Sequence, residues 1–181
     1  MLSRLPASGP PAPPRIAQYD RATPMSSTEL PDPARIRIRH RVEWLDTDAA
    51  GIYHWSTVIR FAESAEAALH NALGITELTF GSTPRLAVSF RFTRPLRFND
   101  EVTVDFAVEH VGRSSVRYGI VVSDDQGRLA ATGAITTCLV DASMSASRPW
   151  PEPVRAALTG AGAQPVGPVS PGAAAPRSSR D

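Results

Sequence analysis

One long helical pattern, followed almost entirely by strand patterns, is the feature that most constrains the fold. From Trp55 to Leu73 apolar residues recur at the 3.6-residue spacing of a helix, and Gly74 follows where helices commonly end. Four later segments alternate apolar and polar residues, as strands with one buried face do. These segments are 86–92, 102–108, 116–122 and 129–140, and a similar strand, 36–44, precedes the helix. The order predicts an α+β domain whose antiparallel sheet curls around one helix.

Proline is concentrated outside this patterned segment. Of the 17 prolines, only Pro84 and Pro95 lie within it. The flanking stretches also lack apolar periodicity, so they offer little apolar surface to offset the entropy of the chain. We therefore expect a disordered N-terminal tail, 1–34, one folded domain, 35–144, and a disordered C-terminal tail, 145–181.

Composition excludes several classes of function. The net charge of +1 gives no reason to expect a nucleic-acid partner. All basic residues are arginine, so a Schiff-base lysine and a lysine-containing phosphate loop are absent. The single cysteine, Cys138, lies in a strand pattern and is interpreted as an inert core thiol, without a disulfide or a metal cluster. No apolar stretch is long enough to span a membrane, and we expect a cytoplasmic protein.

An acidic turn joins the first predicted strand to the helix. It reads Asp-Thr-Asp-Ala-Ala-Gly over 46–51. A helix start presents free backbone N–H groups and the positive end of the helix dipole, and here a carboxylate lies beside it. A carboxylate next to an oxyanion-binding helix start is the minimum equipment for hydrolysing an activated acyl group.

The order of elements and this turn resemble the hotdog fold, in which a curved antiparallel sheet wraps one long central helix. More narrowly, they are similar to the 4-hydroxybenzoyl-CoA thioesterase family and related short acyl-CoA thioesterases. The likeness runs from about Arg35 to Asp141 and is most specific at 46–51, with weaker matches at 94–102 and 111–115. The resemblance implies that the second acid of the turn, Asp48, is catalytic.

The chemistry expected of Asp48 agrees with this implication. Its carboxylate can attack a thioester carbonyl to form a mixed anhydride, or it can deprotonate an attacking water. Free N–H groups at the helix start, those of Trp55 and Ser56, would stabilise the oxyanion. The alternative is a turn-forming or helix-capping aspartate, and that structural role suits Asp46 better.

For each of the other candidate residues the sequence allows a functional role and a structural one. His54 acts in catalysis, orients Asp48 or caps the helix, since several relatives carry their histidine one position later. Tyr53 lines an acyl pocket or packs in the core. Arg113 and Arg94 bind the phosphates of coenzyme A or are surface arginines. Glu63 is a backup acid, because a second hotdog lineage uses a helix glutamate, or it is simply solvated.

The function expected from the sequence is an acyl-CoA thioesterase. It needs no metal or cofactor, because coenzyme A enters only as part of the substrate, and the resemblance implies a homodimer or homotetramer with active sites between subunits. An acyl dehydratase or hydratase using His54 and a non-catalytic acyl-CoA-binding module remain as alternatives. Whether the acyl carrier is coenzyme A or a carrier protein also stays open.

Overall fold

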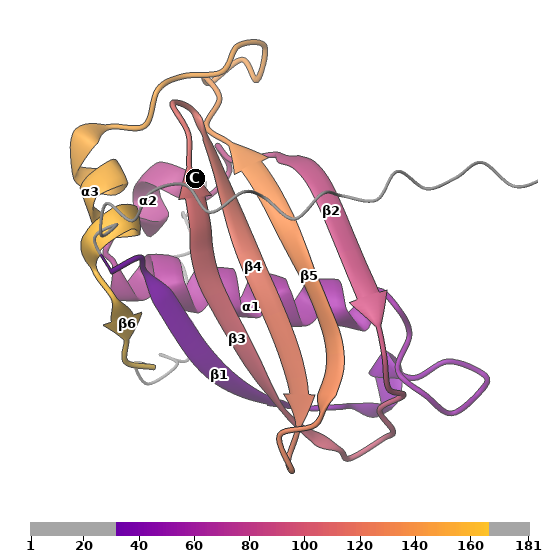
Figure 1. Cartoon of the computed structure of the whole chain (residues 1–181). Helices are drawn as coiled ribbons and strands as arrows, with labels where there is room; N and C mark the ends of the chain where they lie inside the picture. The colour runs from indigo at the N-terminus through magenta and orange to yellow at the C-terminus, as the bar shows by residue number, and fades with distance from the viewer. Residues whose placement is uncertain (1–31, 167–181) are drawn as a thin grey trace, which may run out of the picture.

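A curved sheet lies across one long helix, as Figure 1 shows. The computed structural model describes residues 32–166. The sheet has the order β2-β5-β4-β3-β1-β6, and its neighbours are antiparallel except for the short parallel pair β1 and β6. The elements are β1 (Arg35–Arg41), η1 (Trp44–Asp46), α1 (Thr57–Ala72), α2 (Thr76–Thr79), β2 (Arg85–Phe92), β3 (Glu101–Val111), β4 (Ser115–Asp124), β5 (Leu129–Cys138), α3 (Glu152–Gly160) and β6 (Ala163–Gln164). This arrangement confirms the α+β layout expected from the patterns.

The core forms between α1 and the inner face of the sheet. The helix buries the apolar stripe that the sequence predicts, including Phe61 and Leu69, which are both fully inaccessible. Ala62 and Ala65 lie in the same stripe, and their small side chains let the helix approach the sheet closely. Gly74 follows the helix with φ +68°, a left-handed conformation that glycine adopts without a steric penalty.

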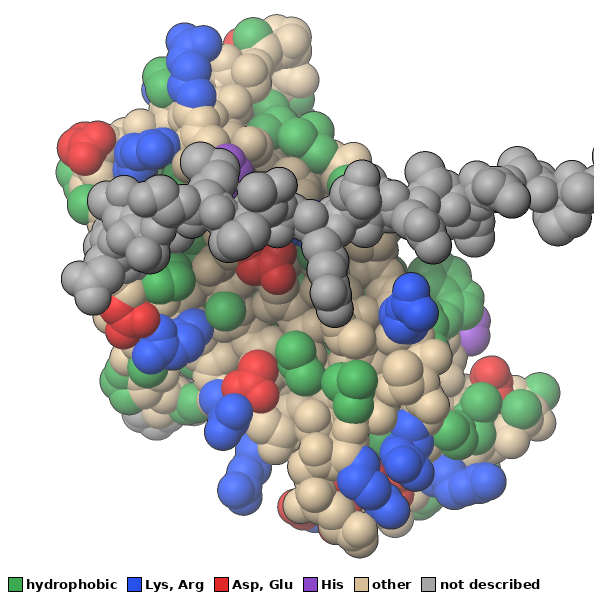
Figure 2. All heavy atoms as spheres, viewed as in Figure 1, with side chains coloured by type: hydrophobic (Ala, Val, Ile, Leu, Met, Phe, Trp, Pro, Cys, Tyr) green, Lys and Arg blue, Asp and Glu red, His purple; other side chains and the backbone are tan. Residues whose placement is uncertain are grey.

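The outer face of the sheet is polar. On β1 the isoleucines Ile36 and Ile38 are buried, while the arginines between them face outward. Arg37 pairs with Asp105 of β3 at 2.6 Å, one of several exposed ion pairs on this face. Figure 2 shows blue and red side chains next to one another on this side of the molecule. Such exposed pairs stabilise a fold by less than about 1 kcal/mol each, so this face is solvated rather than strongly stabilising.

Trp44 departs from its predicted position. Strict alternation from Ile36 predicts that Trp44 faces the core, but its side chain is 77 % exposed. The strand ends at Arg41 and the chain turns into η1, so the period of two no longer applies beyond that point. The indole instead packs edge-on against Phe98, with ring centroids 5.7 Å apart.

Strand β2 is a free edge with an uncovered inner face. Among the strands of residues 32–166, it pairs only with β5. Val88 and Phe92 point to the helix side, yet they are 43 % and 45 % exposed. The reason is that α1 packs on β1 and β3, at the other side of the sheet. An apolar row on an open strand edge is the kind of surface that another chain covers.

The predicted C-terminal boundary is wrong for residues 145–166. This stretch contains α3 and β6, and α3 packs against β3 and buries Val154 and Leu158, with Trp150 just before it. Two prolines of the predicted tail, Pro151 and Pro153, instead stand at the start of α3, where a missing N–H is tolerated.

Of the predicted N-terminal tail, 1–34, the last residue, Ala34, is buried in the core and its N–H donates to Leu158 of α3. Residues 1–31 and 167–181 of the two predicted tails lie outside the described residues.

Candidate functional site

The loop between β1 and α1 is anchored by Asp46. Its carboxylate is buried and accepts hydrogen bonds from Arg60, at 2.5 Å to Oδ2, and from the backbone N–H of Glu43 at 2.8 Å. Its backbone carbonyl accepts the N–H of His54 at 2.7 Å and the hydroxyl of Thr57 at 2.9 Å. Asp46 therefore fixes the path of the loop, in agreement with the structural role expected of it.

Asp48 lies at the surface of this loop. The N–H of Asp48 donates to the carbonyl of Ile52, and its own carbonyl accepts from Gly51, whose φ is +71°. The carboxylate accepts the N–H of Ala50 at 2.8 Å, a local bond typical of turn-forming aspartates. The side chain is exposed, and it lines neither the cavity of about 580 Å³ nor the one of about 380 Å³. Within one chain, then, the arrangement around Asp48 is that of an open turn.

The backbone N–H groups at the helix start differ in whether they have a hydrogen-bond acceptor. The hydroxyl of Ser56 lies 2.7 Å from Nδ1 of His54, and the N–H of Ser56 donates to the same nitrogen at 3.3 Å. With Nδ1 accepting, the neutral imidazole carries its proton on Nε2. Thr57 donates to the carbonyl of His54 at 2.9 Å. Within residues 32–166, the N–H groups of Trp55 and Val58 donate no hydrogen bond, so both are donors left free at the helix start.

Tyr53 is a core residue. Its side chain is only 6 % exposed, and the ring lies 6.0 Å from that of Phe92. Burial raises the pKa of its hydroxyl, which points to the carbonyl of Ala130 at 3.5 Å. The backbone N–H of Tyr53 donates to Leu96, which ties the acidic loop to the connection between β2 and β3. Of the two roles expected for this residue, core packing is the one that the structure displays.

The two arginines expected at one pocket mouth lie at opposite ends of the sheet. Arg94 is exposed in the segment that the acidic loop contacts through Leu96. Arg113 is also exposed, but it lies in the turn after β3, near the start of β2. The reason is that β3 carries the chain along the whole sheet before it turns. Within one chain, Arg113 and Asp48 therefore do not share a site, and the expectation that Arg113 binds a phosphate of coenzyme A stays a prediction.

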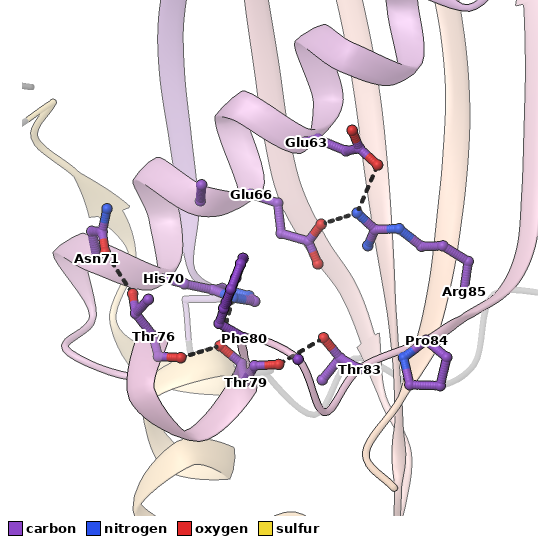
Figure 3. Close-up of a pocket in the computed structure, with 12 residues that line it drawn as sticks. Glu63, Glu66, His70, Asn71, Thr76, Thr79, Phe80, Thr83, Pro84 and Arg85 are labelled. Carbon is purple, nitrogen blue, oxygen red and sulfur yellow. Dashed lines mark hydrogen bonds and ion pairs between the residues drawn. The ribbon is translucent and has the colours of Figure 1, made fainter. Parts of the chain in front are cut away.

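A second cluster of polar groups surrounds a cavity of about 580 Å³ at the other end of α1. Figure 3 shows Glu63 and Glu66 pointing from α1 to Arg85 at the start of β2. The guanidinium lies 2.5 Å from Glu66 and 3.8 Å from Glu63. Glu66 is buried, whereas Glu63, the expected backup acid, is more than half exposed.

His70 forms the inner wall of this cavity. Its Nε2 pairs with the hydroxyl of Tyr118 at 2.9 Å and its Nδ1 with that of Thr79 at 2.9 Å. Burial lowers the pKa of His70, with the nearby charges of Glu66 and Arg85 acting in opposite directions. The ring is consequently neutral at pH 7 and both of its nitrogens are occupied.

Sequence reasoning missed the partners in both clusters. The pattern put Glu63 and Glu66 on one side of the helix, but it gave no sign that Arg85 meets them. Arg60 was equally unmarked, because an arginine on an amphipathic helix is normally solvated. These residues meet only because separate elements pack together, so no local sequence motif could have predicted the pairs.

The family model described as the thioesterase-like superfamily matches residues 42–158, so the chain belongs to that family. This confirms the predicted hotdog fold and the expected class of enzyme, a thioester hydrolase. A search of curated proteins gives no match.

Solved structures of thioesterases superpose on most of the folded chain. A 1,4-dihydroxy-2-naphthoyl-CoA thioesterase from Synechocystis has a TM-score of 0.63 at 16 % identity, over 68 % of this chain and 95 % of the other. A thioesterase from Thermus thermophilus, complexed with coenzyme A and Zn, gives 0.62 at 24 % identity, over 67 % and 90 %. A gentisyl-coenzyme A thioesterase gives 0.60 at 26 % identity, over 68 % and 99 %.

Two further features concern residues 32–166. None of the helices in that range is both long and apolar enough to cross a membrane. The same range contains no group of three or more histidine, cysteine, aspartate or glutamate side chains placed to hold a metal ion.

Proposed function

We propose that this chain hydrolyses acyl-CoA thioesters, with Asp48 as the reacting carboxylate. The observation that carries the proposal is the N–H of Trp55, which has no acceptor within the described residues and lies just before α1, at the end of the loop that carries Asp48. Membership of the thioesterase-like family supports the reaction type. The coenzyme A bound to the Thermus thermophilus relative supports the choice of acyl carrier.

The proposed reaction exchanges a thioester for an acid and a thiol. The carbonyl carbon takes an electron pair from the Asp48 carboxylate, giving a mixed anhydride, or from a water that Asp48 deprotonates. The carbonyl oxygen becomes anionic and accepts the N–H of Trp55. The carbon–sulfur bond then breaks, and coenzyme A leaves as a thiolate that takes up a proton. On the anhydride route, water finally cleaves the anhydride and restores Asp48.

Ser56 and His54 have secondary parts in this proposal. The N–H of Ser56 is directed to His54, so it is a weaker oxyanion donor than Trp55. The Nε2–H of His54 is the group that can orient Asp48 or donate to the substrate, because Nδ1 is already occupied. Arg94, in the segment that contacts the loop, is the better placed of the two arginines to meet a phosphate of coenzyme A bound at the same chain's Asp48.

We infer that a second copy of the chain covers β2 and encloses Asp48. The apolar row on β2 and the exposed Asp48 and Trp55 are what such a copy would shield from water. Exclusion of water strengthens the electrostatic interactions that the reaction needs. Two β2 edges paired by a two-fold axis run antiparallel, so the start of one strand meets the end of the other. We therefore expect a homodimer formed through β2, or a homotetramer built from two such dimers.

Substitution on β2 tests this assembly. We expect Val88→Asp to shift the protein to monomers in analytical ultracentrifugation and to abolish most thioesterase activity together. Val121→Asp is the matched control, because Val121 is similarly exposed, at 40 % against 43 %, but on the outer face of the sheet. A Val88→Asp protein that stays oligomeric and active would contradict the inference.

A panel of acyl-CoA substrates tests the activity itself. We expect thiol release in the wild type and a fall in kcat/KM of about a thousandfold in Asp48→Asn, equivalent to ~4 kcal/mol of transition-state stabilisation. Asp125→Asn is the control, because Asp125 is another exposed turn aspartate. Full activity in Asp48→Asn would overturn the assignment. Reversible absorbance changes with enoyl-CoA that depend on His54 would indicate a hydratase, and binding without turnover would indicate a binding module.

A further inference from the structure

The cavity at the far end of α1 has the size and composition of a ligand site. Its volume of about 580 Å³ falls within the ~300–1,000 Å³ typical of small-molecule pockets. Its lining includes the apolar residues Ala67, Phe80 and Pro84 and the charged residues Glu63, Glu66 and Arg85. Phe80 is 87 % exposed, so an aromatic ring at the rim is available to cover a guest.

The hydrogen-bonding capacity left inside the cavity includes the free acceptor positions of a buried carboxylate, that of Glu66. Both nitrogens of His70 are occupied, and the hydroxyl of Thr83 donates to the carbonyl of Thr79. The guanidinium of Arg85 faces Glu66 and Glu63. In contrast, Arg85 is the only charged partner of Glu66 within residues 32–166, and no other described group donates a hydrogen bond to its carboxylate. A carboxylate can accept several such bonds, so Glu66 keeps free acceptor positions beside the cavity.

The charge balance favours a donor over an acceptor. Two carboxylates and one guanidinium leave the cavity with a formal charge of −1, and the buried His70 adds none because burial lowers its pKa. An anionic guest is repelled. An unsubstituted alkyl end would displace water from the carboxylate of Glu66. Because an alkyl group cannot replace the lost hydrogen bonds, its binding there is unfavourable. A hydroxyl or ammonium group would satisfy it.

The two-fold pairing proposed above brings this cavity to the reacting carboxylate of the partner. In one chain α1 separates them, because Asp48 precedes the helix while Glu66 lies in its second half, roughly 15 Å from Ser56 at about 1.5 Å per residue. Arg85 begins β2, and Phe92, which touches Tyr53 of the acidic loop, ends it. Antiparallel pairing of two such edges therefore places the cavity of one copy beside the acidic loop of the other.

We propose that this cavity receives the acyl group and that Glu66 selects acyl groups whose far end carries a hydrogen-bond donor, a hydroxyl or an ammonium group. The inference rests on the proposed thioesterase function, because it names the substrate class of that same site. Arg85 holds the carboxylate of Glu66 in place, and the apolar lining residues contact the carbon skeleton.

Matched substrates test the selection. The probes are straight-chain acyl-CoAs of six, eight and ten carbons, each with a terminal methyl, hydroxyl, ammonium or carboxylate group. For the wild type we expect kcat/KM to be at least about tenfold higher with a donor than with a methyl end, and lowest with a carboxylate. Comparison of the hydroxyl and ammonium series identifies which donor is preferred. Because the wild type alone gives these ratios, the test does not depend on any variant folding.

Substitution of the acceptor locates the effect. Glu66→Gln should reduce the donor-to-methyl ratio to within about threefold of one and improve turnover of the carboxylate series. Glu109→Gln, which changes an exposed outer-face glutamate, should leave every ratio unchanged. Equal turnover of all end groups in the wild type, or an unchanged ratio in a folded Glu66→Gln, would overturn this inference alone. Absence of turnover with every probe would instead overturn the proposed function and this inference with it.

Discussion

Two arginine–carboxylate pairs lie at the two ends of α1, and they are built differently. Asp46 and Arg60, at the N-terminal end, approach to 2.5 Å, as Glu66 and Arg85 do at the C-terminal end. The carboxylate of Asp46 also accepts a backbone N–H from Glu43. The carboxylate of Glu66 accepts no such bond within residues 32–166 and borders a cavity.

The difference distinguishes an ion pair that only stabilises the fold from one whose carboxylate can also bind a ligand. A buried carboxylate whose acceptor positions are filled can only hold a loop in place, and the loop that Asp46 holds is the one that presents Asp48. A buried carboxylate with free positions beside a cavity is able to bind a guest. Burial and ion pairing alone therefore do not mark a binding group, whereas unfilled hydrogen-bonding capacity beside a cavity does.

The largest expected effect comes from breaking the N-terminal pair. Arg60→Met leaves Asp46 buried without its charged partner, and we expect the free energy of unfolding to fall by about 3 kcal/mol. Denaturant unfolding measures this loss. Arg37→Met is the control, because the Arg37–Asp105 pair is exposed and should contribute less than about 1 kcal/mol. A similar loss in both variants would contradict the structural role of the Asp46 pair.

Breaking the C-terminal pair should cost less stability. In Arg85→Met the carboxylate of Glu66 still reaches water through the cavity, so we expect a loss of about 1–2 kcal/mol. The comparison with Arg60→Met, made in the same unfolding experiment, sharpens the distinction between the two ends. If Arg85→Met lowers the free energy of unfolding as much as Arg60→Met or more, the carboxylate of Glu66 is as inaccessible to water as that of Asp46.

Acid should destabilise the fold through one histidine near each pair. Burial lowers the pKa of His40 and of His70 below 6.5. The unfolded chain therefore binds more protons as the pH falls, so stability is full above about pH 6.5 and decreases below it. The slope is at most about 1.4 kcal/mol per pH unit for each histidine, and less for half-buried His40 because solvent screens it.

Denaturant midpoints between pH 7.5 and 5 measure this dependence. His40 stacks on Phe61 with ring centroids 4.8 Å apart, and its buried Nε2 has no hydrogen-bond partner within residues 32–166. His40→Phe should keep the stacking and reduce the acid sensitivity, whereas both nitrogens of His70 are satisfied. An unchanged pH dependence of stability in His40→Phe would show that His40 does not contribute to acid destabilisation.

The smallest effect is expected at Gly74, which ends α1 near the cavity. Its φ of +68° is unfavourable for alanine, although a Cβ there would meet no atom within 4 Å. Gly74→Ala should therefore lower the free energy of unfolding by about 1 kcal/mol through the backbone alone. Thermal unfolding measures it, with Ala72→Ser, at an exposed helix position, as the control. A stabilised Gly74→Ala protein would contradict the backbone argument.

Much of the fold could be predicted because local patterns were strong. The helix and the five long strands appear where alternation and helical spacing placed them, within a few residues at each end. Trp44 was misplaced because periodicity does not reveal where a strand stops. Helix α3 was missed because its prolines dominated the composition, although Val154 and Leu158 have helical spacing.

The candidate site could be predicted only where it is contiguous. The sequence by itself determined the acidic turn, the helix that follows it and the succession of strands, because these depend on interactions between near neighbours in the chain. The tertiary structure decided that Asp46 is sealed by Arg60, that Arg113 lies far from Asp48, and that Arg85 meets Glu66. Those contacts join segments that only the packing of sheet on helix brings together, and no local propensity encodes their distance.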